Sequence, residues 1–177
     1  MSRLESAIRR LEAQLACLNR AAGLIADIPG PILELGLGNG RTYDHLRTLM
    51  PTRRIIVFER EPMAHPDSMP PPEDLIEGDF RETIPGALMF TRSPAALIHA
   101  DFGSGDKAAT AALASWLAEA VKPLCKKHTL IVSDQPLPIL GSTLLPLPQN
   151  VSEGRYQMQQ MIKNRINYAK AGKSHFI

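Results

Sequence analysis

The sequence predicts an α/β protein built on a doubly wound, mostly parallel β-sheet, with one extra helix before it. Short, almost entirely apolar runs alternate with helical segments, which is typical of parallel strands covered by helices on both faces. A glycine-rich turn joins the first run to the next helix, and a long amphipathic stretch precedes that run. The 177 residues fit a single domain.

An N-terminal amphipathic helix is predicted over residues 3–27. Ser2 and Glu5 have the spacing of a capping box, and the run from Pro29 to Pro31 stops the helix. Apolar residues repeat in steps of four and three, at Leu4, Ile8, Leu11, Leu15, Leu18, Ala22 and Ile25. We favour a helix laid against the domain core. The alternative is a helix that pairs across the interface of a homodimer or higher homo-oligomer.

Five strands are predicted from the apolar runs that follow. They span residues 32–35, 54–58, 74–76, 95–100 and 128–133. Two helices are predicted between them, over residues 41–50 and 106–122, and a proline follows each. A loop with five prolines covers residues 61–73.

The last third of the chain is interrupted by prolines. They exclude a helix across the apolar stretch 137–147, and residues 156–161 are predicted to form a closing strand, with a short helix as the alternative. A basic tail over residues 163–177 is typical of a solvated chain end. Within the single domain we distinguish the N-terminal helix (1–28), the cofactor-binding core (31–135) and the closing strands with the basic tail (136–177).

Composition excludes several classes of protein. The net charge is +2, from 20 basic and 18 acidic residues, which argues against a nucleic-acid partner recognised through bulk charge. Two cysteines cannot form a disulfide framework, and they suit a reducing cytoplasm. Charged residues interrupt the N-terminal stretch, and no apolar run reaches the ~18 residues of a membrane span. We therefore expect a cytoplasmic protein without a membrane partner.

The most informative segment is the turn from Glu34 to Gly40, in which three glycines alternate with other residues. Glycines allow a sharp turn and a close approach of backbone N–H groups to a ligand, next to the positive end of a helix. A dinucleotide site requires G-x-G-x-x-G, but here the third glycine comes one residue early and Arg41 follows it. The alternative is a tight strand–helix turn without a ligand.

An acidic residue two positions before G-x-G-x-G resembles the first motif of class I S-adenosylmethionine-dependent methyltransferases. The segment 35–46 looks most like small, single-domain bacterial members with an unassigned acceptor. The resemblance implies a Rossmann-like fold, S-adenosyl-L-methionine as cofactor and S-adenosyl-L-homocysteine as product. It implies a cofactor site made by Glu34, Gly36, Leu37, Gly38, Asn39, Gly40, Thr42, Tyr43, Glu59, Arg60, Asp79, Phe80 and Asp101.

The same resemblance implies individual roles. Glu34 would complement the positive end of the cofactor, and Glu59 would accept the ribose hydroxyls, unless it is simply an exposed strand-end charge. Asp79 would hold the adenine amino group, with a turn cap as the alternative, and Phe80 would pack near the ring. Arg60 departs from the family pattern, which often has an apolar residue there, although a guanidinium can stack on a ring.

Methyl transfer from a sulfonium is an in-line displacement, so the enzyme must mainly hold donor and acceptor in line. Asp101, at the end of the fourth strand, is the first candidate for acceptor binding or for a base. His99, two positions earlier on the same strand face, is the second candidate, and the alternative is a satisfied core histidine. Tyr43 would contact the methionine part of the cofactor or merely fill space. No metal site is predicted.

The predicted function is transfer of a methyl group from S-adenosyl-L-methionine to a small-molecule acceptor. The alternative is a module that binds S-adenosyl-L-methionine or S-adenosyl-L-homocysteine without turnover. A nicotinamide-dependent oxidoreductase fits poorly because of the glycine spacing. A purely structural oligomer leaves Glu34, Glu59 and Asp79 unexplained.

Overall fold

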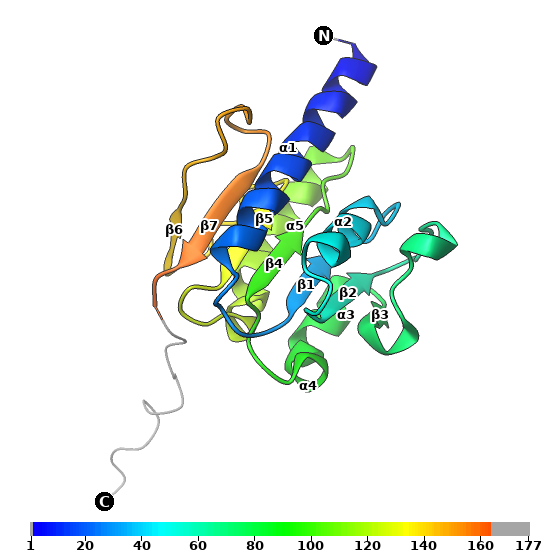
Figure 1. Cartoon of the computed structure of the whole chain (residues 1–177), viewed down its shortest axis with the longest axis vertical. Helices are drawn as coiled ribbons and strands as arrows, with labels where there is room; N and C mark the ends of the chain where they lie inside the picture. The colour runs from blue at the N-terminus through cyan, green and yellow to red at the C-terminus, as the bar shows by residue number, and fades with distance from the viewer. Residues whose placement is uncertain (1, 164–177) are drawn as a thin grey trace, which may run out of the picture.

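A computed structural model describes residues 2–163 and confirms the doubly wound α/β fold (Figure 1). The seven strands lie in the order β3-β2-β1-β4-β5-β7-β6. They are β1 (Ile32–Leu35), β2 (Ile55–Glu59), β3 (Leu75–Glu77), β4 (Leu97–Ala100), β5 (Leu130–Ser133), β6 (Ser142–Leu144) and β7 (Gln157–Met161). The first five strands pair in parallel, and β7 is antiparallel to both of its neighbours. The strand order reverses beside β1, so a crevice is expected at the carboxyl ends of β1 and β4.

Helices cover both faces of the sheet, as the all-apolar strands require. One face carries α1 (Arg3–Leu24) and α2 (Arg41–Leu49), and the other carries α3 (Phe80–Thr83), α4 (Ala87–Thr91) and α5 (Lys107–Ala120). Neighbouring residues of β2 show the alternation. Val57 packs in the cluster that contains residues of α1 and α2, whereas Phe58 packs with residues of α4 and α5.

Helix α1 is capped as the sequence predicts, because Ser2 and Glu5 form both hydrogen bonds of a capping box. Its second half lies against the core, where Cys17 and Leu18 are fully buried. Its first turns project beyond the sheet (Figure 1), and Leu4 and Ile8 are 71% and 46% exposed. The second half of α1 therefore packs against the core, as the favoured interpretation expects. Pairing of the helix across an oligomer interface stays a prediction.

Differences from the predicted elements concern short segments. The closing strand is confirmed as β7, but β6 was not predicted, since its three residues lie in a proline-rich stretch with little pattern. The short helices α3 and α4 were also not predicted, and the predicted strand 95–100 begins only at Leu97. The basic tail lies outside the described residues except for Lys163. Across the described part of the chain, every helix is too short or too polar to span a membrane.

Candidate active site

The glycine loop joins β1 to α2, and its three glycines have different constraints. All three have positive φ, at 97° for Gly36, 51° for Gly38 and 78° for Gly40. A Cβ at Gly36 would lie 2.5 Å from the Asp101 carbonyl oxygen, and one at Gly40 would lie 2.8 Å from the Ser68 carbonyl oxygen. A Cβ at Gly38 would meet no atom within 4 Å. The outer glycines are therefore required by the fold, whereas Gly38 leaves space open in front of the loop.

The carboxylate of Glu59, at the end of β2, accepts four backbone hydrogen bonds. Its Oε2 accepts from the N–H groups of Leu37 at 2.7 Å and Gly38 at 3.1 Å, both in the glycine loop. Its Oε1 accepts from the N–H groups of Arg60 at 2.7 Å and Glu61 at 3.2 Å. Burial alone would raise the pKa of Glu59, but the four donors outweigh it and hold the pKa below its usual range. Glu59 therefore keeps its negative charge and fixes the glycine loop.

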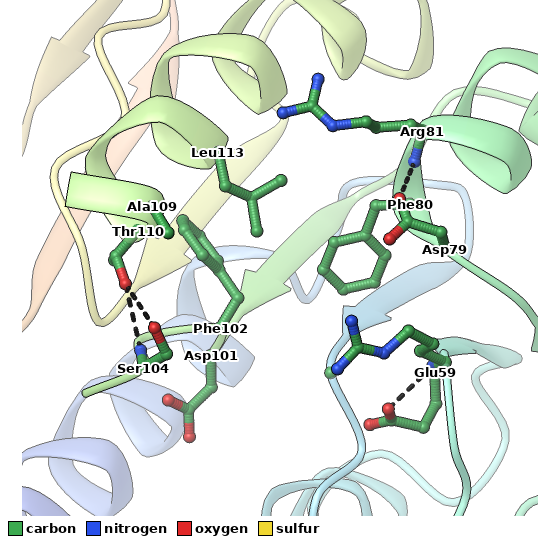
Figure 2. A pocket seen from close by; sticks show the side chains of 12 residues that line it. Glu59, Asp79, Phe80, Arg81, Asp101, Phe102, Ser104, Ala109, Thr110 and Leu113 are labelled. Atoms are coloured by element: carbon green, nitrogen blue, oxygen red, sulfur yellow. Dashed lines mark hydrogen bonds between the residues drawn. The ribbon is translucent and has the colours of Figure 1, made fainter. Parts of the chain in front are cut away.

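A cavity of about 420 Å³ opens beside Glu59, at the carboxyl ends of the strands (Figure 2). Figure 2 shows Glu59, Asp79 and Phe80 on one side and Asp101, Phe102 and Ser104 on the other. Its lining residues are Gly36, Glu59, Arg60, Asp79, Phe80, Arg81, Asp101, Phe102, Ser104, Ala109, Thr110 and Leu113. The residues that the sequence predicts for ribose and adenine thus share one cavity.

Asp79 has a structural role in addition to its place in this cavity. Its carboxylate accepts from the Arg81 N–H at 2.8 Å and caps the start of α3, which is the alternative that the sequence left open. The guanidinium of Arg81 lies 5.1 Å from the ring centre of Trp116, in the range of a cation–π contact. These contacts fix the wall of the cavity around Asp79.

A second cavity of about 200 Å³ lies next to the first. It is lined by Arg10, Leu11, Gln14, Gly36, Leu37, Gly38, Asn39, Arg41, Thr42, Asp101 and Gly103. Gly36 and Asp101 line both cavities, so the two cavities are neighbours beside the glycine loop, and we call them together the cleft. Helix α1 contributes Arg10, Leu11 and Gln14 to the smaller cavity, whereas Asp79 lines only the larger one.

Asp101 follows β4 and is held by side chains of α1. The Gln14 amide donates to its Oδ2 at 2.5 Å, and Arg10 Nη1 lies 3.7 Å from the same oxygen. Burial and the charge of Asp134 raise the pKa of Asp101, against the opposing charges of His99 and Arg10. Asp134 itself accepts from the N–H groups of Phe102 and Gly103 and so caps the loop after β4.

A buried polar network lies beneath the glycine loop. Glu34 and His99 are both 0% exposed, and His99 Nδ1 lies 2.7 Å from Glu34 Oε2. The Thr42 hydroxyl donates to the other oxygen of Glu34, and His99 Nε2 lies 2.6 Å from the Tyr156 hydroxyl. Burial by itself would lower the pKa of His99, but the charge and hydrogen bond of Glu34 outweigh it, so the pKa is raised.

This network changes the interpretation of two predicted residues. Glu34 and His99 are fully buried and line neither cavity. The Glu34 carboxylate accepts from the Thr42 hydroxyl at the start of α2 and lines neither cavity, so its predicted contact with the cofactor stays a prediction. His99 has a partner on each ring nitrogen, which is the satisfied core histidine of the alternative interpretation.

Ten of the thirteen predicted cofactor residues line the cleft. The three that do not are Glu34, Gly40 and Tyr43. Tyr43 is 6% exposed and packs in the core with the Arg47 guanidinium over its ring, so it fills space there.

The sequence did not predict Arg10, Leu11 and Gln14 as residues of the site, because only the packing of α1 brings them to the loop after β4. Within residues 2–163, no group of three or more His, Cys, Asp or Glu side chains is placed to hold a metal ion.

Strand order, a glycine loop after β1 and acidic residues at the ends of β2 and β4 define the methyltransferase type of Rossmann-like fold. The family described as S-adenosyl-L-methionine methyltransferase matches residues 1–161. The chain is also 40% identical to an S-adenosyl-L-methionine methyl transferase from Silicibacter pomeroyi DSS-3, with a TM-score of 0.83 over 90% of this chain and 99% of that chain. The chain therefore belongs to the S-adenosyl-L-methionine methyltransferase family, and its cofactor is S-adenosyl-L-methionine.

More distant structures share the fold. Cofactor-bound Rv0187 from MTB is 15% identical, with a TM-score of 0.55 over 90% of this chain and 91% of that chain. A putative O-methyltransferase from Klebsiella pneumoniae is 15% identical, with a TM-score of 0.51 over 85% of this chain and 80% of that chain. No curated protein matches the chain. The family match confirms a methyltransferase and so favours the enzyme over the binding module.

Proposed function

We propose that S-adenosyl-L-methionine lies along the cleft, with its nucleoside in the larger cavity and its amino-acid end in the smaller one. The observation that carries this proposal is that Gly36 and Asp101 line both cavities, so one extended ligand can occupy them together. The open space in front of Gly38 leaves room for a ligand against the loop. The residues of the cleft therefore fit this cofactor.

Glu59 and Asp79 are proposed to hold the nucleoside. Two of the four hydrogen bonds to Glu59 are long, at 3.1 and 3.2 Å, and these are the bonds that ribose hydroxyls can replace at least cost. Asp79 and Phe80 stand together in the same cavity, where they can bind and cover the adenine ring. Arg60 lines this cavity as well and can stack on the ring through its planar guanidinium.

A small-molecule acceptor fits the chain best. The sheet, its covering helices and the loops that join them account for residues 2–163, and the described part of the chain contains no added domain that would bind a macromolecule. When bound, S-adenosyl-L-methionine supplies a methyl group on a positively charged sulfur. The chain holds donor and acceptor in line, and Asp101, whose carboxylate borders both cavities, is placed to serve an acceptor that loses a proton.

The test is a calorimetric titration with S-adenosyl-L-methionine, S-adenosyl-L-homocysteine and NAD in parallel. We expect both sulfur compounds to bind and NAD not to bind. At ~100 times its dissociation constant, a bound ligand should stabilise the fold by about 2.7 kcal/mol. Binding of NAD alone would overturn the proposal. Turnover is then screened with small-molecule acceptors by following the formation of S-adenosyl-L-homocysteine.

A substitution of Gly38 tests whether the cofactor binds against the glycine loop. Gly38→Asn places a side chain in the open space before the loop, and asparagine tolerates a positive φ better than most residues. Gly154→Asn is the matched control, because Gly154 also has a positive φ and open space around its Cβ position but lies outside the cleft. We expect Gly38→Asn alone to lose binding. Equal binding by both variants would place the cofactor elsewhere.

A further inference from the structure

Another cavity, of about 400 Å³, lies at the opposite end of the strands from the cleft. Its lining residues are Gly30, Pro31, Thr52, Arg53, Arg54, Thr91 and Ser93. Gly30 and Pro31 directly precede β1, and Arg53 and Arg54 directly precede β2, so the cavity lies at the amino ends of these parallel strands. Among the described residues, none lines both this cavity and the cleft. A ligand here would therefore leave the cleft free.

Every polar side chain of this lining can donate a hydrogen bond. Thr52, Thr91 and Ser93 contribute hydroxyl groups, and the two neighbouring arginines contribute guanidiniums. The lining, as far as the described residues form it, contains no carboxylate and no amide side chain. Such a set of donors suits a ligand that carries several hydrogen-bond acceptors and a negative charge.

The positive charge of Arg53 is not balanced by an ion pair within residues 2–163. Its guanidinium donates to four backbone carbonyl oxygens of residues 25–30, the turn after α1, at 2.7 to 3.3 Å. Carbonyl oxygens satisfy the N–H groups but carry no full negative charge. Lys126 donates to the carbonyl oxygen of Pro29 in the same turn, and burial together with the charge of Arg53 lowers the pKa of Lys126. Two cations thus lie close together at this end of the sheet.

The Arg54 guanidinium is held in place but keeps free donors. Its Nε donates to the Asp74 carboxylate at 2.6 Å. Its Nη1 and Nη2 each donate to one backbone carbonyl, that of Phe90 at 3.0 Å and that of Glu73 at 3.3 Å. A guanidinium has five N–H groups, so two of them remain for a ligand. The bond to Phe90 fixes the guanidinium next to the end of α4, where Thr91 lies.

Thr91, the last residue of α4, gives the observation that points most directly to a ligand. It is 4% exposed, and within the described part of the chain its buried hydroxyl has no hydrogen-bond partner. Buried polar groups in folded proteins are nearly always paired, because an unpaired one loses its bonds to water without replacement. Thr91 also lines this cavity, so a ligand bound there can supply the partner.

We propose that this cavity binds a phosphate group through Thr91, Ser93 and the Arg54 guanidinium. A phosphate dianion offers several acceptor oxygens, whereas a carboxylate offers two, and the lining contains three hydroxyls and two guanidiniums. The guanidinium donates to phosphate oxygens in the planar geometry that arginine favours, and the hydroxyls donate to the others. The phosphate can be the free ion or part of a monoester. The volume falls within the ~300–1,000 Å³ of small-molecule sites, which favours a monoester.

The experiment titrates inorganic phosphate and glycerol 3-phosphate by calorimetry at constant ionic strength. Both are added to the unmodified chain, to Thr91→Val and to Thr143→Val. Thr91→Val removes the hydroxyl and keeps the shape of the side chain. Because this hydroxyl has no partner in the protein, the variant should be at least as stable as the unmodified chain when phosphate is absent. Thr143 is the matched control, since it is an exposed threonine of β6 that lines neither this cavity nor the cleft.

We expect Thr91→Val to weaken the binding of both phosphates by about 10- to 100-fold, the usual range for a lost hydrogen bond to a charged group. A second variant, Ser93→Ala, should weaken them in the same direction, and Thr143→Val should change neither. Tighter binding of glycerol 3-phosphate than of inorganic phosphate would assign the site to a monoester. Equal or tighter binding of inorganic phosphate would assign it to the free ion.

Three outcomes would overturn the phosphate site. The first is that the unmodified chain binds neither phosphate, and the second is that binding survives unchanged in Thr91→Val. The third is that saturating S-adenosyl-L-homocysteine displaces the phosphate, because the ion would then lie in the cleft, where Arg10 and Arg41 also attract anions. The comparison of Thr91→Val with Thr143→Val needs no cofactor, so it decides this inference independently of the proposed function.

Discussion

Glu34 and Glu59 stand on neighbouring strands on either side of the glycine loop, yet their surroundings are opposite. Glu34 is completely buried, and its partners are the side chains of Thr42 and His99. Glu59 borders the cleft, and its partners are four backbone N–H groups, two of them from the loop. The Glu34 carboxylate binds the start of α2, directly after the loop, through Thr42. The Glu59 carboxylate binds the loop backbone itself, on the side of the larger cavity.

The strand register explains the difference. Glu34 pairs with Val57 of β2 on one side and with His99 of β4 on the other, so it lies inside the sheet. The last pair of β1 and β2 joins Leu35 and Phe58, and Glu59 comes after it. Glu59 therefore lies one residue beyond the pairing with β1, at the level of the loop, while it still pairs with Glu77 of β3. For these two carboxylates, position relative to the end of the β1–β2 pairing, rather than residue type, decides which one lines the cleft.

Removal of Glu34 should have the largest effect on stability. Glu34→Ala leaves His99 and Thr42 without their buried partner, and loss of one member of a buried ion pair costs ~3–5 kcal/mol. At ~2–4 °C per kcal/mol for a chain of this size, the thermal midpoint should fall by roughly 10 °C. Thermal and urea unfolding measure this loss.

The control for this prediction is Glu61→Ala, because Glu61 is exposed and its side chain lies outside the network. It should leave the midpoint nearly unchanged. If Glu34→Ala unfolds no more easily than Glu61→Ala, the network does not support the loop and the comparison with Glu59 fails.

Substitution of Glu59 should instead affect ligand binding most. In Glu59→Gln the amide NH₂ faces backbone N–H donors and cannot accept from them or from a ribose hydroxyl. We expect S-adenosyl-L-homocysteine to bind about 10- to 100-fold more weakly, with a stability loss of ~1–2 kcal/mol, smaller than that for Glu34. Calorimetry and urea unfolding on the same samples separate the two quantities. A variant that loses as much stability as Glu34→Ala, with unchanged affinity, would contradict this prediction.

The same contrast shows what the sequence could predict. Strand–helix alternation and the glycine spacing predict the fold, the loop and the positions of Glu59 and Asp79, because these depend on order along the chain. The burial of Glu34 could not be predicted, since it depends on the register of β1 against β4. Arg10 could not be placed either, because the contact with Asp101 joins residues far apart in the sequence. Local pattern predicts strand ends, but packing decides which side chains reach the cleft.

The pH dependence of stability gives the smallest and most specific test. The pKa of His99, the partner of Glu34, is raised, whereas the pKa of Glu59 is lowered. The pKa of His99 is raised, chiefly by Glu34 acting against burial, so the folded state keeps a proton that the unfolded state loses. Stability from this pair is complete below the usual histidine pKa of ~6.5 and is lost as pH rises through the raised value.

The pKa of Glu59 is lowered, so its contribution is present above the usual glutamate pKa of ~4.3 and is lost as pH falls through the lowered value. Thermal midpoints measured across pH should therefore decline at both ends. His99→Gln should remove the decline on the alkaline side and keep the acid one, whereas Glu59→Gln should weaken only the acid decline. An alkaline decline that survives in His99→Gln would mean that the buried pair does not carry the proton, and that Glu34 supports the loop through Thr42 alone.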